Sequence, residues 1–141
     1  MKLSTKQTAQ HRTNLAAHAD FLDALGNYEV QGLGKFDMSV YALDDKHINM
    51  NPPELLKKNC ATAACALGHV VNVPDLKEQV MEMYQKEGNS LAWWQVSQTL
   101  FGVSEFYNTK AFLFLFGENN PNSPSAAAQR IRKYLKLTAA K

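Results

Sequence analysis

Apolar residues recur at helical spacing along most of the chain, and short stretches rich in glycine, proline, asparagine and serine separate the apolar segments. The first segment runs from about residue 4 to residue 25, where Leu15, His18, Leu22 and Leu25 share one face of a helix. Further helices are expected at residues 52–58, 62–71, 74–87, 91–101 and 104–116, and from residue 124 onward. The pattern therefore predicts a mainly α-helical protein of about six helices.

Residues with capping side chains stand where several of these helices should begin. Asn51 precedes two prolines, which suit the first turn of a helix, and Ser123 precedes Pro124 in the same way. Thr62 and Ser104 are placed to cap the helices that follow them. These residues predict the helix starts more sharply than the apolar spacing does.

One segment alternates instead of following a helical period. Phe36, Met38 and Val40 predict one short strand near residues 36–42, although no strong partner strand is visible in the sequence. A length of 141 residues with 45% hydrophobic content suffices for one core, and no repeat or domain-sized linker interrupts the chain. We therefore expect residues 1–141 to form a compact single helical domain.

The composition bears on the compartment in which the protein works. The first residues lack the apolar centre of a signal peptide, and the longest strongly apolar run, residues 111–116, is too short to cross a bilayer. Two cysteines are too few for a disulfide scaffold. We expect a cytoplasmic protein with no membrane association.

Charges are unevenly distributed along the chain. Residues 1–13 and 121–141 contain basic residues and no acid, which leaves all 13 acidic residues in the stretch between them. Solvated terminal helices would explain this pattern, and so would two partner surfaces or a homo-oligomer in which ends meet middles. The last helix, with Arg130, Arg132 and Lys133, could also lie along a phosphate backbone, which makes nucleic acid an alternative partner.

Large aromatic residues crowd two consecutive predicted helices, and one face of each helix cannot bury them all. Two alternatives follow. Either the rings fill the core of a small protein, or some of them lie exposed at a groove or subunit contact, where aromatic residues are enriched. Trp93 or Trp94 could stack on a small anionic, nucleotide-like ligand held by Arg130, Arg132 and Lys133, although no phosphate-binding glycine loop accompanies them. The crowded residues are Trp93, Trp94, Phe101, Phe106, Phe112, Phe114 and Phe116.

Residues 59–69, N-C-A-T-A-A-C-A-L-G-H, offer three interpretations. Cys60, Cys65 and His69, together with His47, supply the two sulfurs and two imidazoles of a tetrahedral zinc site, but their spacing is unusual for one. Cys65 and His69 are four residues apart and could form a thiol–imidazole pair, while Cys60 could be activated by a helix N-terminus. We favour a tightly packed helix whose cysteines are buried as small apolar side chains, with no cofactor.

Two motifs also carry a resemblance. F-D-M at residues 36–38, followed by C-A-T-A-A-C-A-L-G-H at 60–69, resembles a family of small, largely uncharacterised bacteriophage and bacterial proteins with an F-[DN]-M element and a C-G-T-x-x-C-x-x-G-H-like signature. Ala61 replaces the usual glycine, and the spacer before Cys60 is long. The resemblance implies a small accessory protein, encoded by a phage and acting inside a bacterial cell.

These observations lead to one leading hypothesis and two alternatives for the function. The absence of a catalytic constellation favours a non-enzymatic protein that binds a protein partner, such as a host defence or regulatory macromolecule, and blocks it. The first alternative is capture of a small anionic ligand by the residues named above. The second is an enzyme that depends on Cys60 or Cys65 with His69.

Overall fold

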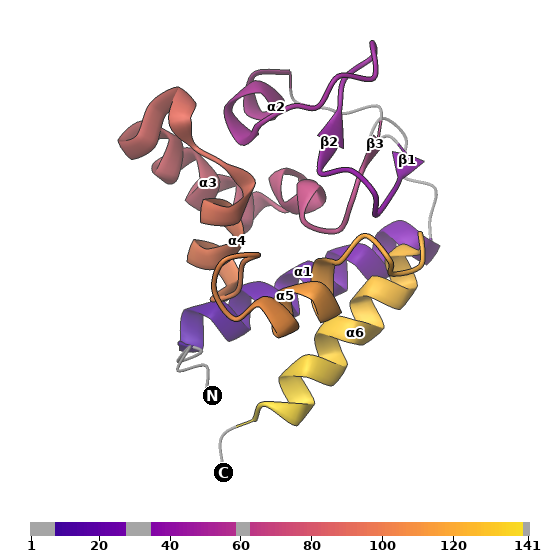
Figure 1. Ribbon diagram of the computed structural model, residues 1–141. Helices are drawn as coiled ribbons and strands as arrows, with labels where there is room; N and C mark the ends of the chain where they lie inside the picture. Colours follow the sequence, from indigo (N-terminus) through magenta and orange to yellow (C-terminus); the bar gives the residue numbers. More distant parts are fainter. Residues whose placement is uncertain (1–7, 28–34, 59–62, 140–141) are drawn as a thin grey trace.

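The computed structural model describes residues 8–27, 35–58 and 63–139. Within these ranges the chain forms six α-helices, two short 3-10 helices and three two-residue strands, so the prediction of a mainly helical fold is confirmed (Figure 1). The α-helices are α1 (Ala9–Asn27), α2 (Pro52–Lys58), α3 (Pro74–Glu87), α4 (Trp93–Phe101), α5 (Thr109–Phe116) and α6 (Pro124–Leu137). None of these helices is both long enough and apolar enough to cross a membrane.

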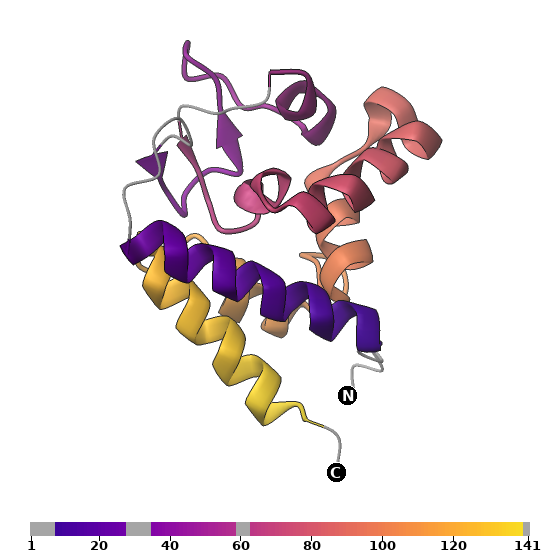
Figure 2. The same cartoon turned by 180° about the vertical axis from the view of Figure 1, so that it is seen from behind.

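The first and last helices, α1 and α6, lie side by side and run antiparallel (Figures 1 and 2). Near the start of α1, the Arg12 guanidinium donates to the carbonyl oxygen of Leu135 at 2.6 Å. Further along, Asp20 and Asp23 of α1 form ion pairs with Arg132 of α6. Part of the positive charge of the C-terminal helix is therefore neutralised within this helix pair.

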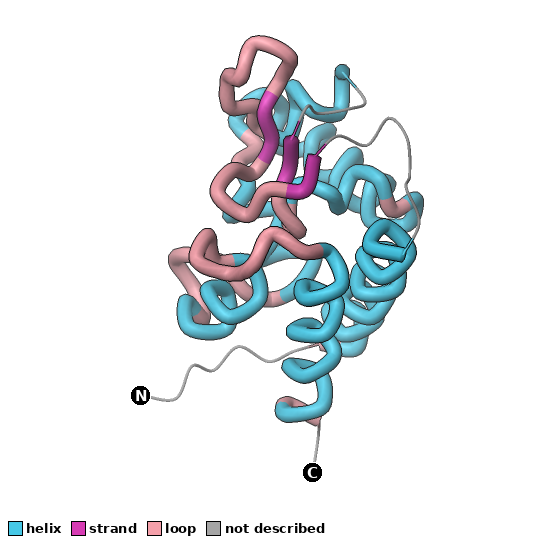
Figure 3. Tube along the Cα trace, turned by 90° about the vertical axis from the view of Figure 1, so that its right-hand side faces the viewer, coloured by secondary structure: helices cyan, strands magenta, loops and turns pink. Residues whose placement is uncertain are grey.

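A small three-stranded sheet lies at the other end of the molecule (Figure 3). Its central strand β3 (Ala63–Ala64) pairs in parallel with β1 (Lys35–Phe36) and antiparallel with β2 (Ala42–Leu43). The region expected to hold one strand, residues 36–42, contains the end of β1 and the start of β2 on either side of a turn. The partner that the alternation could not reveal is β3.

The helix expected over residues 62–71 is wrong in its first half. Ala63 and Ala64 form β3, and helical turns begin only at the 3-10 helix η1 (Gly68–Asn72). Strand pairing on both sides overrides the helix preference of alanine, a tertiary effect that local propensity does not contain. The chain then passes close to Tyr41, because a Cβ atom on Gly68 would lie 1.9 Å from the Tyr41 carbonyl oxygen. The predicted cap, Thr62, lies outside the described residues.

Two predicted helix starts are confirmed in atomic detail. The Asn51 side chain accepts from the Glu54 backbone N–H at 3.0 Å, and the Glu54 carboxylate accepts from the Asn51 N–H at 3.1 Å, which is a capping box at the start of α2. The Ser123 hydroxyl accepts from the Ala126 N–H at the start of α6. These local hydrogen bonds explain why capping residues predicted both boundaries correctly.

A third predicted start is wrong. The Ser104 hydroxyl accepts from the backbone N–H groups of Phe106 and Tyr107, so it caps a turn that ends before the helix. Helix α5 begins only at Thr109. Phe106, expected inside the helix, therefore lies in the preceding loop and is exposed.

The core lies between the α1–α6 pair, α4, α5 and the segment from β3 to α3. The predicted face of α1 is confirmed, because Leu15, His18 and Leu22 are fully buried. Asn14 joins three helices: its amide group donates to the Leu100 carbonyl oxygen and to Gln79, both at 2.9 Å. Figure 2 shows α1 crossing the face of the molecule beneath η1 and α3.

Candidate functional site

Cys65 and His69 follow β3 but have different surroundings. The Cys65 sulfur accepts from the Gly68 backbone N–H at 3.4 Å. The His69 ring stacks with Phe36, with 5.7 Å between centroids, and its Nδ1 lies 3.1 Å from the side-chain amide of Asn72. The hydrogen bonds of the thiol and the imidazole thus go to separate partners.

Burial sets the ionisation of both groups. It raises the pKa of the Cys65 thiol to about 11 and lowers the pKa of the His69 imidazole to about 4. At neutral pH both side chains are therefore uncharged, whereas a nucleophilic pair requires a thiolate that its base can generate. The burial of Cys65 and His69 therefore supports their interpretation as packed core side chains over their interpretation as a reactive thiol–imidazole pair.

The proposed zinc ligands are only partly in view. Among residues 8–27, 35–58 and 63–139, no three histidine, cysteine or acidic side chains are close enough together to hold a metal ion. His47 lies exposed on a turn with a φ of 60°, while Cys65 and His69 are buried. Cys60 lies outside the described residues, so the complete four-residue set stays a prediction.

The residues proposed to bind an anion lie on two elements and differ in availability. Arg132 pairs with Asp20 and Asp23, whereas Lys133 is exposed. Arg130 is half-buried, and its Nε and Nη2 atoms have no partner among the described residues. Burial lowers the pKa of Arg130.

The two tryptophans lie on α4 rather than α6. The Trp93 indole N–H donates to the Met50 carbonyl oxygen at 2.9 Å, and its ring stacks on Tyr41. The rings of Trp94 and Phe106 pack nearly perpendicular to each other, with 5.5 Å between their centroids. The buried ring of Trp93 offers little surface to a stacking ligand.

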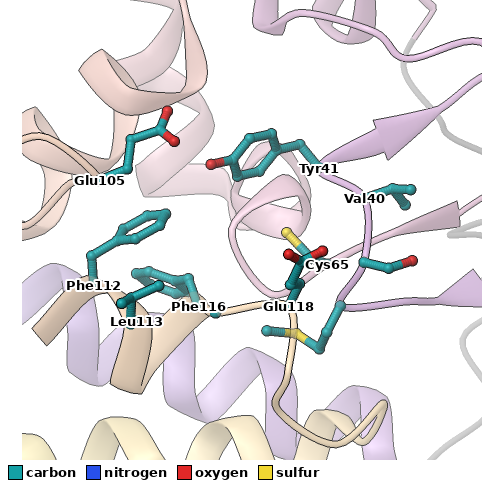
Figure 4. A pocket seen from close by; sticks show the side chains of 11 residues that line it. Val40, Tyr41, Cys65, Glu105, Phe112, Leu113, Phe116 and Glu118 are labelled. Atoms are coloured by element: carbon teal, nitrogen blue, oxygen red, sulfur yellow. The ribbon is translucent and has the colours of Figure 1, made fainter. Parts of the chain in front are cut away.

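A pocket of about 280 Å³ opens beside Tyr41, between the turn after β1 and helix α5 (Figure 4). Phe112, Leu113 and Phe116 of α5 form its apolar wall. Its polar side chains come from elsewhere in the chain: Ser39, Tyr41, Cys65, Glu105 and Glu118. The two glutamates stand before and after α5, and both are exposed.

The polar side of this pocket carries negative charge. In Figure 4 the Tyr41 hydroxyl points toward the Glu105 side chain, and the Cys65 sulfur lies between Tyr41 and Glu118. Burial, with smaller effects from Glu105 and Cys65, raises the pKa of Tyr41 to about 12. The phenol is therefore protonated at neutral pH and remains a hydrogen-bonding group beside two carboxylates.

A second, wider pocket of about 520 Å³ adjoins the first along residues 39–41. It adds Glu54, Trp93 and the loop from Asn49 to Asn51. We call the two pockets together the 39–41 groove. Its lining contains three carboxylates, Glu54, Glu105 and Glu118, and no lysine, arginine or histidine. These glutamates are far apart in the chain and belong to no motif, so no sequence pattern marks them.

The crowded aromatic residues divide between the core and the surface, so each of the two alternatives applies to some of them. Trp93, Phe101, Phe112 and Phe116 are buried. Phe106 is 71% exposed and Leu113 is 55% exposed, and Tyr107 and Phe114 are partly exposed beside them in the sequence. We call these last four side chains the 106–114 surface. It meets the 39–41 groove at Leu113 and at Glu105, which precedes Phe106.

Comparison with protein-family models, curated proteins and solved structures yields no match to this chain. The resemblance of the F-D-M and C-A-T-A-A-C-A-L-G-H motifs to small phage and bacterial proteins therefore stays a prediction.

Proposed function

We propose that this chain is a non-enzymatic binding protein that contacts a protein partner through the 106–114 surface and the adjoining 39–41 groove. The observation that carries the proposal is the exposure of Phe106, Tyr107, Leu113 and Phe114 within one short stretch, next to a groove with a distinct charge. Single exposed apolar side chains are normal on a surface, whereas several in one short stretch, of which Leu113 also lines a pocket, favour an interaction site.

Burial of this surface would supply binding energy. Covering a phenylalanine or leucine side chain that was exposed to water contributes about 1.5–3 kcal/mol. Phe106 and Leu113, the two most exposed members, retain over half of their surface for this purpose. These two side chains could therefore anchor a small interface with a partner protein, of the size found in weak, reversible complexes.

The two alternatives have less support from the described residues. A cysteine enzyme requires a thiolate, and the buried Cys65 thiol is protonated at neutral pH. A nucleotide-like ligand requires free cations beside an accessible ring. Arg132 is paired and Trp93 is buried. Arg130 and Lys133 lie on α6, while the half-buried Trp94 lies on α4. That the partner is a host defence or regulatory macromolecule, blocked by a phage-encoded protein, is the part of the proposal supported by the motif resemblance alone.

The test is partner capture followed by reconstitution. Wild-type protein, the double variant Phe106→Ser/Leu113→Ser and the control Leu137→Ser are tagged and expressed in the native cells. Leu137 is 69% exposed at the end of α6, away from the proposed surface, so its substitution changes surface hydrophobicity in the same manner. All three proteins should retain the same melting temperature, because the changed side chains are exposed.

We expect a protein that wild type and Leu137→Ser capture and that the double variant does not. The purified partner should then bind wild type with a defined stoichiometry. Equal capture by all three proteins would contradict the proposed surface. Concentration-dependent self-association that only the double variant loses would assign the surface to a second copy of this chain instead.

A further inference from the structure

The 39–41 groove combines an apolar wall with carboxylates that have no countercharge. Glu105 and Glu118 flank the narrower pocket and Glu54 borders the wider one. Within the described residues no lysine or arginine forms an ion pair with any of the three. Three negative charges around one concave surface attract a cation more strongly than an isolated surface carboxylate does.

We infer that the 39–41 groove receives a basic side chain, lysine or arginine, from an extended segment of the protein partner. The inference rests on the proposed function and specifies the chemistry of the partner. The cationic head group would lie beside Glu105 and Glu118, and the rest of the segment would cover the 106–114 surface. The sequence around the basic residue should therefore be apolar.

The shape of the narrower pocket fits a long basic side chain. Lysine and arginine place an apolar stem below a charged head group, and the stem packs on apolar surface while the head remains at a polar rim. Phe112, Leu113 and Phe116 supply that surface, and the two glutamates supply the rim. The volume of about 280 Å³ lies just below the range of about 300–1,000 Å³ for small-molecule sites. It is suited to one inserted side chain.

Tyr41 adds a neutral hydrogen-bonding group at the junction of the two pockets. Its phenolic oxygen can accept from an ammonium or guanidinium N–H while Glu105 provides the charge. The wider pocket beyond Tyr41, with Glu54 and Trp93, leaves room for a neighbouring residue of the same segment. A phosphate group of nucleic acid would instead meet three carboxylates, so charge excludes it from this groove.

A peptide-display selection tests the inference directly. Random 12-residue peptides are selected on the folded wild-type chain, and the strongest binder is synthesised. A second peptide replaces its basic residue with an uncharged analogue: norleucine for lysine, which keeps the carbon chain without the amine, or citrulline for arginine, which keeps the length. Binding of both peptides is measured by fluorescence polarisation at low and high salt.

Three variants accompany the wild type. Glu105→Gln/Glu118→Gln removes the two carboxylates of the narrower pocket. Glu78→Gln/Glu82→Gln removes two exposed carboxylates of α3 and so changes the net charge equally. Phe106→Ser/Leu113→Ser removes the two most exposed side chains of the 106–114 surface. Because Leu113 also lines the narrower pocket, the inference is separated from the proposed function by Glu105→Gln/Glu118→Gln, which leaves the apolar surface unchanged.

We expect the selected peptides to share a lysine or arginine flanked by apolar residues. The neutral analogue and Glu105→Gln/Glu118→Gln should each weaken binding about tenfold or more, in line with one lost charge-assisted contact. The α3 control should change it less than about twofold, and added salt should weaken the wild-type complex, as expected of partly exposed charges.

Several outcomes would overturn the inference. These are selected peptides without a basic residue, no selected binder at all, or equal weakening by the pocket and α3 variants. Free butylamine or guanidine binding as tightly as the peptide would make the groove a small-cation site instead. If a captured protein partner is lost with Phe106→Ser/Leu113→Ser and unaffected by Glu105→Gln/Glu118→Gln, the inference fails and the protein-binding proposal stands.

Discussion

Acidification should destabilise this protein because two histidines are buried without charge in its core. His18 Nε2 is hydrogen-bonded to the Ala66 carbonyl oxygen, which can only accept, so Nε2 carries the proton and Nδ1 does not. The Asn72 amide donates to His69 Nδ1, which leaves the proton of that ring on Nε2. His18 Nδ1 and His69 Nε2 are both buried with no hydrogen-bond partner among the described residues.

The direction of the effect follows from the two pKa values. Burial is the main cause that lowers the pKa of His18 to about 4; the Ala66 hydrogen bond opposes it, and the neighbouring His69 adds a smaller lowering effect. Burial also lowers the pKa of His69 to about 4. The unfolded chain, with an ordinary histidine pKa of about 6.5, therefore binds more protons than the folded chain between pH 6.5 and 4. Stability is complete above this window and falls as the pH falls through it.

The magnitude is large compared with ordinary protein stability. The difference between 6.5 and about 4, at about 1.4 kcal/mol for each pH unit, corresponds to about 3 kcal/mol for each histidine. A domain of this size is typically stable by about 5–15 kcal/mol. Loss of even half of the combined effect would shift the urea midpoint well outside experimental error.

The assay is urea unfolding at a series of pH values between 7 and 4.5, with tryptophan fluorescence as the signal that reports unfolding. The wild type should lose several kcal/mol across the series. His69→Leu removes one titrating group and should flatten the curve by roughly half, relative to its own value at pH 7. The control His47→Asn changes an exposed histidine and keeps a residue that tolerates the positive φ of 60°.

Two results would refute this reasoning. One is a free energy of unfolding that stays constant from pH 7 to pH 4.5. The other is an unchanged pH dependence in His69→Leu, which would mean that groups other than His69 bind the protons.

Three further predictions concern packing and reactivity. Asn14→Ala should destabilise the protein by about 1–3 kcal/mol in urea unfolding, because the Leu100 carbonyl oxygen loses a buried donor at 2.9 Å; an unchanged midpoint would show that water replaces it. Gly68→Ala should cost about 3 kcal/mol or more in calorimetry, since its Cβ would lie 1.9 Å from the Tyr41 carbonyl oxygen; an unchanged melting temperature would contradict this close approach. In a Cys60→Ser background, Cys65 should react with a disulfide reagent at pH 8 at least about tenfold more slowly in the folded protein than in urea, because burial raises its pKa to about 11; equal rates would contradict its burial.

Most helices could be predicted from the sequence because their causes are local. The apolar spacing of α1 and the capping residues Asn51 and Ser123 act within a few residues of the positions that they determine. Such signals are contained in any short window of the chain. For the crowded aromatic rings the sequence left two alternatives open, burial in the core or exposure at a contact, and the structure divides them between the two.

Strand β3 depended on the tertiary structure instead. Ala63 and Ala64 favour a helix on their own, and only pairing with β1 and β2 makes them extended. The same segment brings Gly68 against Tyr41 and places Cys65 at the pocket rather than on a helix face with His69.

The candidate site depended on the tertiary structure still more. Glu54, Glu105 and Glu118 follow no sequence motif, and they border one groove only because α2, the loop before α5 and the turn after α5 meet around residues 39–41. The sequence by itself determined the helical class, the apolar faces and two of the helix caps, because these depend on neighbouring residues. The fold alone decided which distant charges share a surface, because that depends on how the helices pack.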